Sequence, residues 1–208
     1  MFPNGHLPKK PMNDIVTRED LLKALRLEGC ACNFDTEFER IADALFNRFA
    51  IRKGDRLYRF VEIEFYHNLT DPAPIDSITY PRTSAAGQFF FHQSGVDLTF
   101  LSHRSGSEPR FGGILIRSIR HDDRFILGPY KVMDELFDSF DAFGRVSGFP
   151  EIVEHVRGDR FKPYKTTRWN IKPKEKAFRF TLPYDIWKDK DHKGYAAFPW
   201  YYDGSPKK

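Results

Sequence analysis

The sequence predicts a single α+β domain with a curved, mainly antiparallel β-sheet flanked by helices. Two helical patterns come first, and a run of short alternating segments with few long crossovers follows them, which is the order typical of this fold class. Aromatic residues make up 16% of the chain, including 21 phenylalanines, and such side chains are costly to leave in water. A length of 208 residues is enough for one domain with its own core.

Capping residues and apolar spacing predict the helices. The first helix, within residues 17–29, opens on a Thr-x-x-Asp sequence and ends on a glycine. The second, residues 36–49, opens with a capping box formed by Thr36 and Glu39. A third helix is predicted within residues 131–140, after a Gly-Pro pair. The apolar residues of the second helix recur on one face, which must pack on the core: Phe38, Ile41, Ala42, Leu45 and Phe49.

The first 16 residues hold three prolines and no apolar periodicity, so we expect residues 1–16 to form a flexible arm and residues 17–208 to form the domain. Cys30 and Cys32 are separated by one residue, a spacing that seldom meets disulfide geometry, so we interpret them as free thiols. The chain has neither a membrane-spanning apolar run nor the apolar core of a signal peptide. We therefore expect an intracellular protein without membrane contacts, cytoplasmic and nucleoid-associated in a bacterium or nuclear in a eukaryote.

The strand predicted at residues 56–66 carries two carboxylates. Period-two alternation places Glu62 and Glu64 on one face, with Leu57, Val61, Ile63 and Phe65 on the other. The acidic face also receives three aromatic rings, which come from Tyr58, Phe60 and Tyr66. Such a face suits a cleft in which a flat ring stacks beside an acid. It is also typical of a half-exposed strand whose glutamates point to solvent, and the strand alone favours this second interpretation.

Further strands are predicted at residues 88–94, 96–102, 112–120 and 177–182. The third of these is apolar on both faces and contains Arg117, and a buried guanidinium needs a carboxylate or a bound anion. The sequence leaves a structural ion pair and a functional role equally open.

Histidines and charge restrict the possible chemistry. His92 follows three phenylalanines, where a histidine is more often a packing residue than a catalyst. The histidines are dispersed and match no zinc motif, so we expect neither a metal nor another cofactor. Residues 160–179 combine Arg and Lys with Phe, Tyr and Trp, a composition that suits nucleic acid but also a solvated charged surface. The net charge of +4 does not by itself show that the protein binds nucleic acid, because many basic proteins bind none.

Five short segments follow one another along the chain: VEIEFY, PRT, GQFFFHQSG, GGILIRSI and GPYKVMDEL. In order and spacing they resemble the central motifs of the alkyladenine, or 3-methyladenine, DNA glycosylase family. The resemblance covers roughly residues 38–140 and, more faintly, the segments TTRWNI and AFRFTL. In this alignment Glu64 falls on the family's general base, Tyr66 on its pocket tyrosine and Arg117 on its arginine. Gly128, Pro129 and Lys131 correspond to the start of the family's following helix.

The resemblance implies that a modified base is flipped out of DNA and that its N-glycosidic bond is hydrolysed without a metal. Glu64 would activate the attacking water, Arg117 would hold the nucleotide, and Tyr66 with Phe91 or His92 would sandwich the base. We expect the protein to act on DNA as a monomer, with these residues in contact with DNA: Arg82, Ser94, Lys131, Lys165 and Arg168.

The chain departs from the family in its substrate-reading residues. The family's histidine about eleven positions after the base is missing, since Ile75 and Asp76 stand there, and Ser94 replaces its intercalating tyrosine. The pocket asparagine is not recognisable near Asp97. The pattern fits a glycosylase for another modified base or a nucleic-acid-binding protein that lacks the reaction. A partner-binding protein without affinity for DNA is a third interpretation.

Overall fold

The computed structural model describes residues 14–28, 34–68, 76, 78–104, 109–138, 148–168 and 178–183. Most of the expected N-terminal arm, both cysteines, and residues 169–177 of the basic segment lie outside the described residues. The helices are α1 (Arg18–Ala24), α2 (Phe34–Arg48) and α3 (Pro129–Leu136). The strands are β1 (Phe49–Lys53), β2 (Arg56–Asn68), β3 (Phe89–His92), β4 (Gly95–Thr99), β5 (Phe111–His121), β6 (Arg124–Leu127), β7 (Glu151–Glu154), β8 (Tyr164–Thr166) and β9 (Arg179–Thr181).

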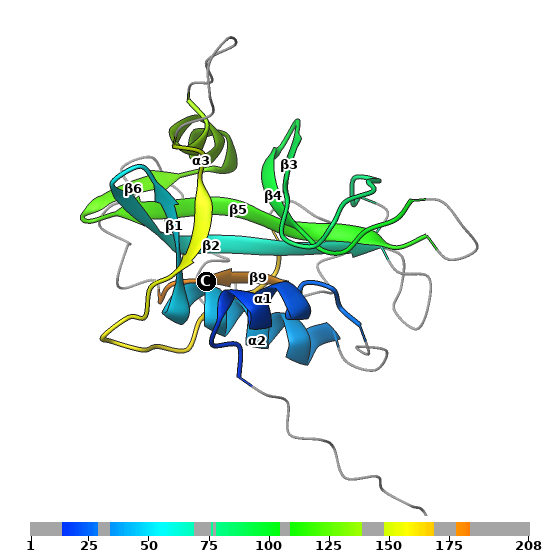
Figure 1. The fold of residues 1–208 in the computed structure, drawn as a ribbon, viewed down its shortest axis with the longest axis horizontal. Coiled ribbons are helices and arrows are strands. Elements are labelled where there is room, and N and C mark those ends of the chain that lie inside the picture. The colour runs from blue at the N-terminus through cyan, green and yellow to red at the C-terminus, as the bar shows by residue number, and fades with distance from the viewer. Residues whose placement is uncertain are drawn as a thin grey trace, which may run out of the picture.

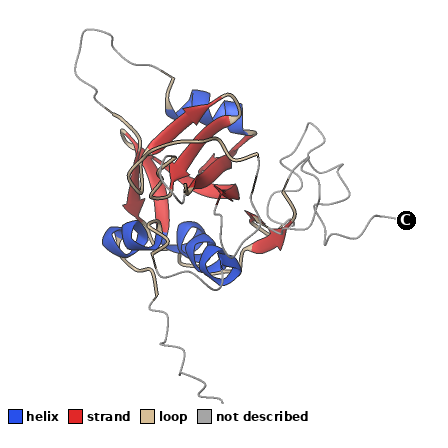
Figure 2. Ribbon diagram, turned by 90° about the vertical axis from the view of Figure 1, so that its right-hand side faces the viewer, coloured by secondary structure: helices blue, strands red, loops and turns tan. Residues whose placement is uncertain are grey.

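All strand pairings within the described residues are antiparallel and join the strands into one nine-stranded, curled half-barrel sheet. Its main path runs β3-β4-β5-β2-β1-β7, while β6 pairs with β5, β9 with β2 and β8 with β9. Helices α1 and α2 lie together on one side of the long strands β2 and β5, and α3 lies on the other (Figures 1 and 2). The predicted α+β class with a curved antiparallel sheet is therefore confirmed.

The three predicted helices are present, but their bounds differ from the predictions. Helix α1 ends at Ala24 rather than near Gly29, and α3 ends at Leu136 rather than near residue 140. Helix α2 ends at Arg48, so Phe49, which was expected on its apolar face, is the first residue of β1.

Thr17 caps α1 as a capping box: its hydroxyl accepts from the Asp20 amide at 3.1 Å, and its own amide donates to the Asp20 carboxylate at 2.9 Å. Thr36 does not cap α2, because the helix already includes Phe34. Helix α3 begins at Pro129 after Gly128, whose φ of 107° favours glycine.

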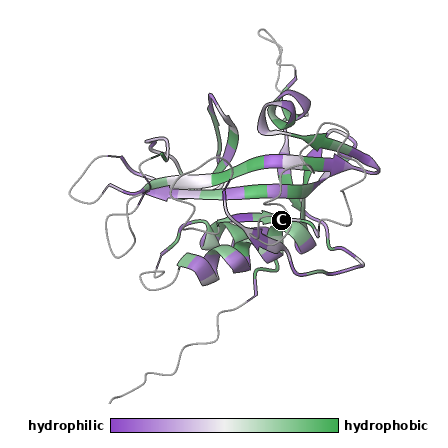
Figure 3. Ribbon diagram, turned by 180° about the vertical axis from the view of Figure 1, so that it is seen from behind, coloured by the Kyte–Doolittle hydropathy of each residue, from purple (hydrophilic) through white to green (hydrophobic). Residues whose placement is uncertain are grey.

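The core lies between the sheet and α2. At its centre Phe38 of α2 stacks on Phe65 of β2, with ring centroids 4.5 Å apart, and on Phe100, at 5.7 Å. Bands of apolar and polar residues alternate along the long strands (Figure 3). The central strands are buried on both faces, since positions 111–119 of β5 are all buried. Glu62, Glu64 and Arg117, the charged residues at the middle of these strands, are therefore withdrawn from water.

The alternation predicted for β2 fails at its centre. The register between β2 and β5 shifts on both sides of Glu62, between Phe60 and Glu62 and again between Glu62 and Ile63. A β-bulge of this kind breaks the period-two pattern. Tyr58 and Phe60, which we expected beside the carboxylates, belong to the hydrophobic core and are 0% and 1% exposed.

Within the described ranges, no helix has the length and apolar character needed to cross a bilayer.

Candidate functional site

Four charged side chains meet at the middle of the sheet. Arg117 of β5 donates through Nε to Glu62 Oε1 at 2.9 Å and through Nη1 to Glu64 Oε2 at 3.2 Å. Arg179 of β9 places Nη2 2.6 Å from Glu62 Oε1 and Nε 3.9 Å from Glu64 Oε1. Both carboxylates are fully buried. The cluster therefore contains two acids and two guanidiniums and is neutral overall.

Strand register explains why these residues meet. Glu64 lies opposite Leu115 of β5 on one side and opposite Arg179 of β9 on the other. Residues that face each other across antiparallel strands project to the same side of the sheet. Arg117 falls within the register irregularity beside Glu62, which brings its side chain into reach of both acids. The sequence expectation that Arg117 meets a carboxylate is confirmed, and it meets two.

The surroundings determine the protonation of this cluster. Burial alone would raise the pKa of Glu62, but Arg179, Arg117 and a hydrogen bond from Ser118 at 3.0 Å together hold that pKa below its ordinary value. Burial and the nearby Glu64 carboxylate raise the pKa of Tyr66 well above its ordinary range, so its phenol stays protonated. Tyr66 donates its hydroxyl to Glu64 Oε2 at 2.7 Å.

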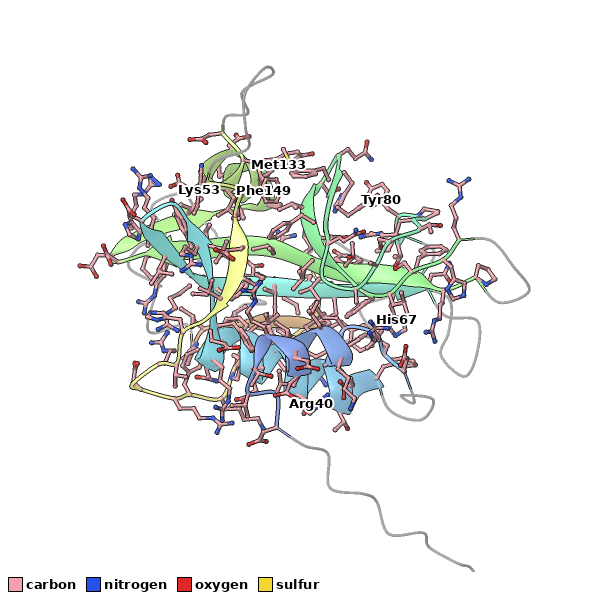
Figure 4. All side chains as sticks on the ribbon, viewed as in Figure 1. Arg40, Lys53, His67, Tyr80, Met133 and Phe149 are labelled. Carbon is pink, nitrogen blue, oxygen red and sulfur yellow. The ribbon has the colours of Figure 1, made fainter. Side chains whose placement is uncertain are left out.

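A cleft of about 440 Å³ opens beside this cluster. Tyr66 and Arg117 border it directly, whereas Glu64 is absent from its lining and has no exposed surface among the described residues. The carboxylate therefore lies one layer behind the wall of the cleft. Tyr80, which is labelled in Figure 4 near the β3–β4 hairpin, also lines it. The remaining lining residues are Ile78, Thr79, Arg82, His92, Ser94, Asp97, Leu115, Pro129 and Tyr130.

A second buried network forms another wall of the cleft. Arg82 donates through Nη1 to Asp97 Oδ2 at 2.6 Å, and its guanidinium lies 4.1 Å from the ring centroid of Phe90. Asp97 Oδ1 is 3.0 Å from His92 Nε2, and the Ser94 amide donates to His92 Nδ1 at 3.1 Å. Because Nδ1 accepts, Nε2 carries the proton that bonds Asp97. His92 thus uses both ring nitrogens within the protein and serves as a fixed ring rather than a free base.

Two polar atoms of this wall lack a partner among the described residues. They are Nη2 of Arg82 and Oγ1 of Thr79, and both are buried. Buried polar groups are normally hydrogen-bonded, and the exceptions mark sites where another molecule can supply the bond. Arg82 Nη2 and Thr79 Oγ1 are therefore unsatisfied polar atoms on residues that line the cleft.

The structure brings most of the predicted base-pocket residues together. Tyr66, His92 and Arg117 line one cleft, and Tyr80 lies against His92 with ring centroids 4.6 Å apart. Phe91 does not line the cleft. It is 44% exposed and packs edge-on against Phe137 at 4.7 Å, because successive residues of a strand point to opposite faces.

The residues predicted to contact DNA are scattered. Ser94 lines the cleft, and Lys131 is exposed on α3. Arg82 is not on the surface, since its side chain is 1% exposed and paired with Asp97. Lys165 is ion-paired with Glu39 of α2 at 2.8 Å and does not border the cleft.

Arg168 also departs from the role expected for it. Its guanidinium is buried, forms an ion pair with Asp76 and lies 4.8 Å from the ring centroid of Tyr66. A buried guanidinium offers little surface to a phosphate of DNA. Its position instead supports Tyr66, the residue that separates Glu64 from the cleft.

Sequence reasoning missed three residues of the site. Arg179 was assigned to a strand without a role, although its charge within an apolar strand was the same signal that singled out Arg117. Asp97 drew attention only as the neighbour of a missing asparagine, yet it holds both Arg82 and His92. Tyr80 lies in a proline-rich stretch that carries no pattern.

Among the described residues, no group of three or more His, Cys, Asp or Glu side chains is arranged to hold a metal ion. Comparison of the whole chain with protein-family models, curated proteins and solved structures finds no match. The resemblance to the alkyladenine glycosylases therefore depends on the short motifs alone.

Proposed function

We propose that the protein is a monofunctional DNA glycosylase that takes a flipped, modified base into the cleft and hydrolyses its N-glycosidic bond. The observation that carries the proposal is the contact of Glu64 Oε2 with both Tyr66 Oη at 2.7 Å and Arg117 Nη1 at 3.2 Å. These are the three residues that the motifs align with the family's base, pocket tyrosine and arginine. Two of them border a cleft large enough for a nucleobase.

In this proposal Glu64 accepts a proton from the attacking water. A general base must lie within hydrogen-bond reach of the proton that it removes. In the structure the Tyr66 hydroxyl donates a hydrogen bond to Glu64 Oε2. The phenol must therefore rotate away from Glu64 when a base enters, so that water can reach the carboxylate. Arg117 then remains hydrogen-bonded to Oε2 and holds the carboxylate in position until water binds.

The walls of the cleft suit a flat, polar ligand. Tyr66 and Tyr80 supply aromatic surfaces, and base–aromatic stacking contributes about 1–3 kcal/mol per base. Arg82 Nη2 and Thr79 Oγ1 offer the hydrogen bonds that they do not make within the described residues. Such groups would read the edge of the base.

The experiment incubates the protein with duplexes that each contain one modified base, and abasic sites are revealed by alkaline cleavage. Glu64→Gln should abolish product. Glu62→Gln is the matched variant, because it removes a carboxylate from the same buried cluster without touching Tyr66, and it should retain activity in proportion to its folded fraction. A panel that yields no abasic site with the wild type, while DNA binding persists, rejects the enzyme.

A second function, a non-catalytic nucleic-acid-binding protein on the same scaffold, is favoured by one observation. Glu64 is fully buried and engaged by Tyr66 and Arg117, as expected for a structural ion cluster. This function predicts DNA binding that survives Glu64→Gln. Neutralising Lys162, Lys165 and Lys172 would then weaken binding and flatten its dependence on salt. A partner-binding protein would show no salt-sensitive DNA binding with any variant.

A further inference from the structure

Three arginines, Arg59, Arg120 and Arg157, form a cluster outside the cleft. Arg59 of β2 and Arg120 of β5 are direct partners in the strand register, and Arg157 follows β7. None of them lines the cleft. Like charges placed directly opposite each other on neighbouring strands destabilise a sheet. A protein that keeps such a pair needs a compensating negative charge.

Arg157 is held in place by the surrounding backbone and a ring. Its amide donates to the carbonyl of Asn47 at 2.8 Å, and its guanidinium lies 4.9 Å from the ring centroid of Phe161. Its side chain is 6% exposed. Within the described part of the chain, its Nη1 is buried and makes no hydrogen bond. A buried and unsatisfied guanidinium nitrogen is costly unless a ligand completes it.

The acids nearby do not balance the three guanidiniums. Arg157 donates to the Asp159 carboxylate through Nη2 at 3.0 Å and through Nε at 3.3 Å, but the Asp159 side chain is 82% exposed. Asp123 acts on Arg120 only through space and is also exposed. Arg59 donates to the carbonyl oxygen of His155 at 2.5 Å, which carries no formal charge.

The pKa values of this cluster are lowered by burial and by repulsion among its positive charges. Burial, followed by repulsion from Arg157 and Arg120, lowers the pKa of Arg59 to about 10. Burial and Arg157 likewise lower the pKa of Arg120. Burial and the nearby Arg59 lower the pKa of His155, which keeps the imidazole neutral at neutral pH. Each group is thus positioned to gain from an added anion.

We propose that Arg59, Arg120 and Arg157 form a binding site for a phosphate group. Guanidinium is planar and presents paired N–H donors that match two oxygens of a phosphate. The unbonded Nη1 of Arg157 supplies a donor that no described residue uses. The same chemistry fits a free phosphate or phosphomonoester and a phosphodiester of a nucleic-acid backbone. The site does not depend on the reaction proposed for the cleft.

The test measures the thermal midpoint of the full chain with inorganic phosphate and with chloride at equal ionic strength. Phosphate should raise the midpoint of the wild type. Arg120→Gln should unfold at a higher temperature than the wild type in chloride, because the repulsion is relieved, and should bind phosphate roughly tenfold more weakly. Arg26→Gln is the matched control, since Arg26 is exposed and paired with Glu28, and it should respond to phosphate as the wild type does.

A second arm titrates a short duplex over a range of salt. If the natural ligand is a backbone phosphodiester, Arg120→Gln should lower the salt slope by about one phosphate contact, while Arg26→Gln should not. If Arg120→Gln loses the thermal response to phosphate, the site binds a free phosphate or phosphomonoester. If it loses part of the salt slope, the site binds a phosphodiester of the DNA backbone. Arg59→Gln repeats both measurements should Arg120→Gln fail to fold. The proposal is overturned if the variants that fold match Arg26→Gln in both arms. Glycosylase activity enters neither readout, so failure of the enzyme proposal would leave this result unaffected.

Discussion

Arg179 Nη2 lies 2.6 Å from Glu62 Oε1, and the two side chains are 1% and 0% exposed. This pair joins the short strand β9 to the centre of the sheet, where Glu64 and Arg117 complete a neutral cluster. Withdrawing such charges from water is costly, and their mutual attraction offsets that cost only while every partner is present. The same cluster that holds β9 in place therefore also fixes the carboxylate proposed as the base.

Replacing Arg179 with methionine should destabilise the protein by about 3–5 kcal/mol, because it leaves two buried carboxylates with one guanidinium. The free energy of unfolding in urea measures the effect. Arg52→Met is the control, since Arg52 is half exposed and bonded to Glu151 at the surface, and it should change stability by less than about 1 kcal/mol. Equal effects of the two substitutions would contradict a special role for the cluster.

Stability should fall in acid, in part because of Glu62. Its pKa in the folded protein is held below the ordinary value of 4.5 by Arg179 and Arg117, against the opposing effect of burial. A group with a depressed folded pKa contributes stability above its unfolded pKa and loses it as the pH falls through its folded pKa. Wild type and Glu62→Gln should thus differ most near neutral pH and converge as the pH falls through the folded pKa of Glu62. Urea unfolding at several pH values checks this, and a constant difference would exclude the linkage.

The fold was largely predictable because helix caps and apolar periodicity are local signals. The Thr17 capping box and the strand predicted at residues 56–66 both appear in the structure. The register irregularity at Glu62 was not predictable, because it depends on which residue of β5 faces which residue of β2. For that reason Tyr58 and Phe60 were assigned to the wrong face.

The sequence analysis missed short strands that form only because they pair with a neighbouring strand. Strand β7, Glu151–Glu154, has two glutamates at its ends and forms by pairing with β1. At the candidate site, charges within apolar strands indicated burial, but only the fold shows which carboxylate pairs with which guanidinium. The sequence therefore predicted a carboxylate partner for Arg117 but could not predict that Arg82 pairs with Asp97.

Substituting Asp97 with asparagine should destabilise the protein by about 3–5 kcal/mol, because it removes the only carboxylate that contacts Arg82 in the described structure. It also disturbs the partner that fixes His92. Asp122→Asn serves as the control, since Asp122 is 88% exposed at the side chain, and it should change stability only slightly. Thermal unfolding of both variants distinguishes a buried ion pair from a general loss of negative charge.

Gly112→Ala should disrupt the pairing of β5 with β2. A Cβ at Gly112 would lie 2.3 Å from the carbonyl oxygen of Tyr66 and 2.8 Å from Cα of His67, and backbone atoms cannot yield as a side chain can. Overpacking typically costs about 1–3 kcal/mol. Gly158→Ala, whose Cβ would meet nothing within 4 Å, should be tolerated. Denaturant unfolding that ranks the two alanines equally would show that the close approach of β5 to β2 is absent in solution.

Tyr66→Phe tests the contact that separates Glu64 from the cleft. The change removes the hydroxyl that donates to the buried carboxylate at 2.7 Å while keeping the ring that lies against Arg168. A hydrogen bond to a charged group contributes about 1.5–3 kcal/mol, so stability should fall by that amount. Tyr130→Phe is the control, because the exposed Tyr130 donates its hydroxyl to a backbone carbonyl of Gln93, and it should lose less than about 1.5 kcal/mol. Unfolding free energies near neutral pH provide the measurement. If Tyr66→Phe costs no more than Tyr130→Phe, the phenol does not bind Glu64 in solution, and the carboxylate needs no rotation of Tyr66 to reach the cleft.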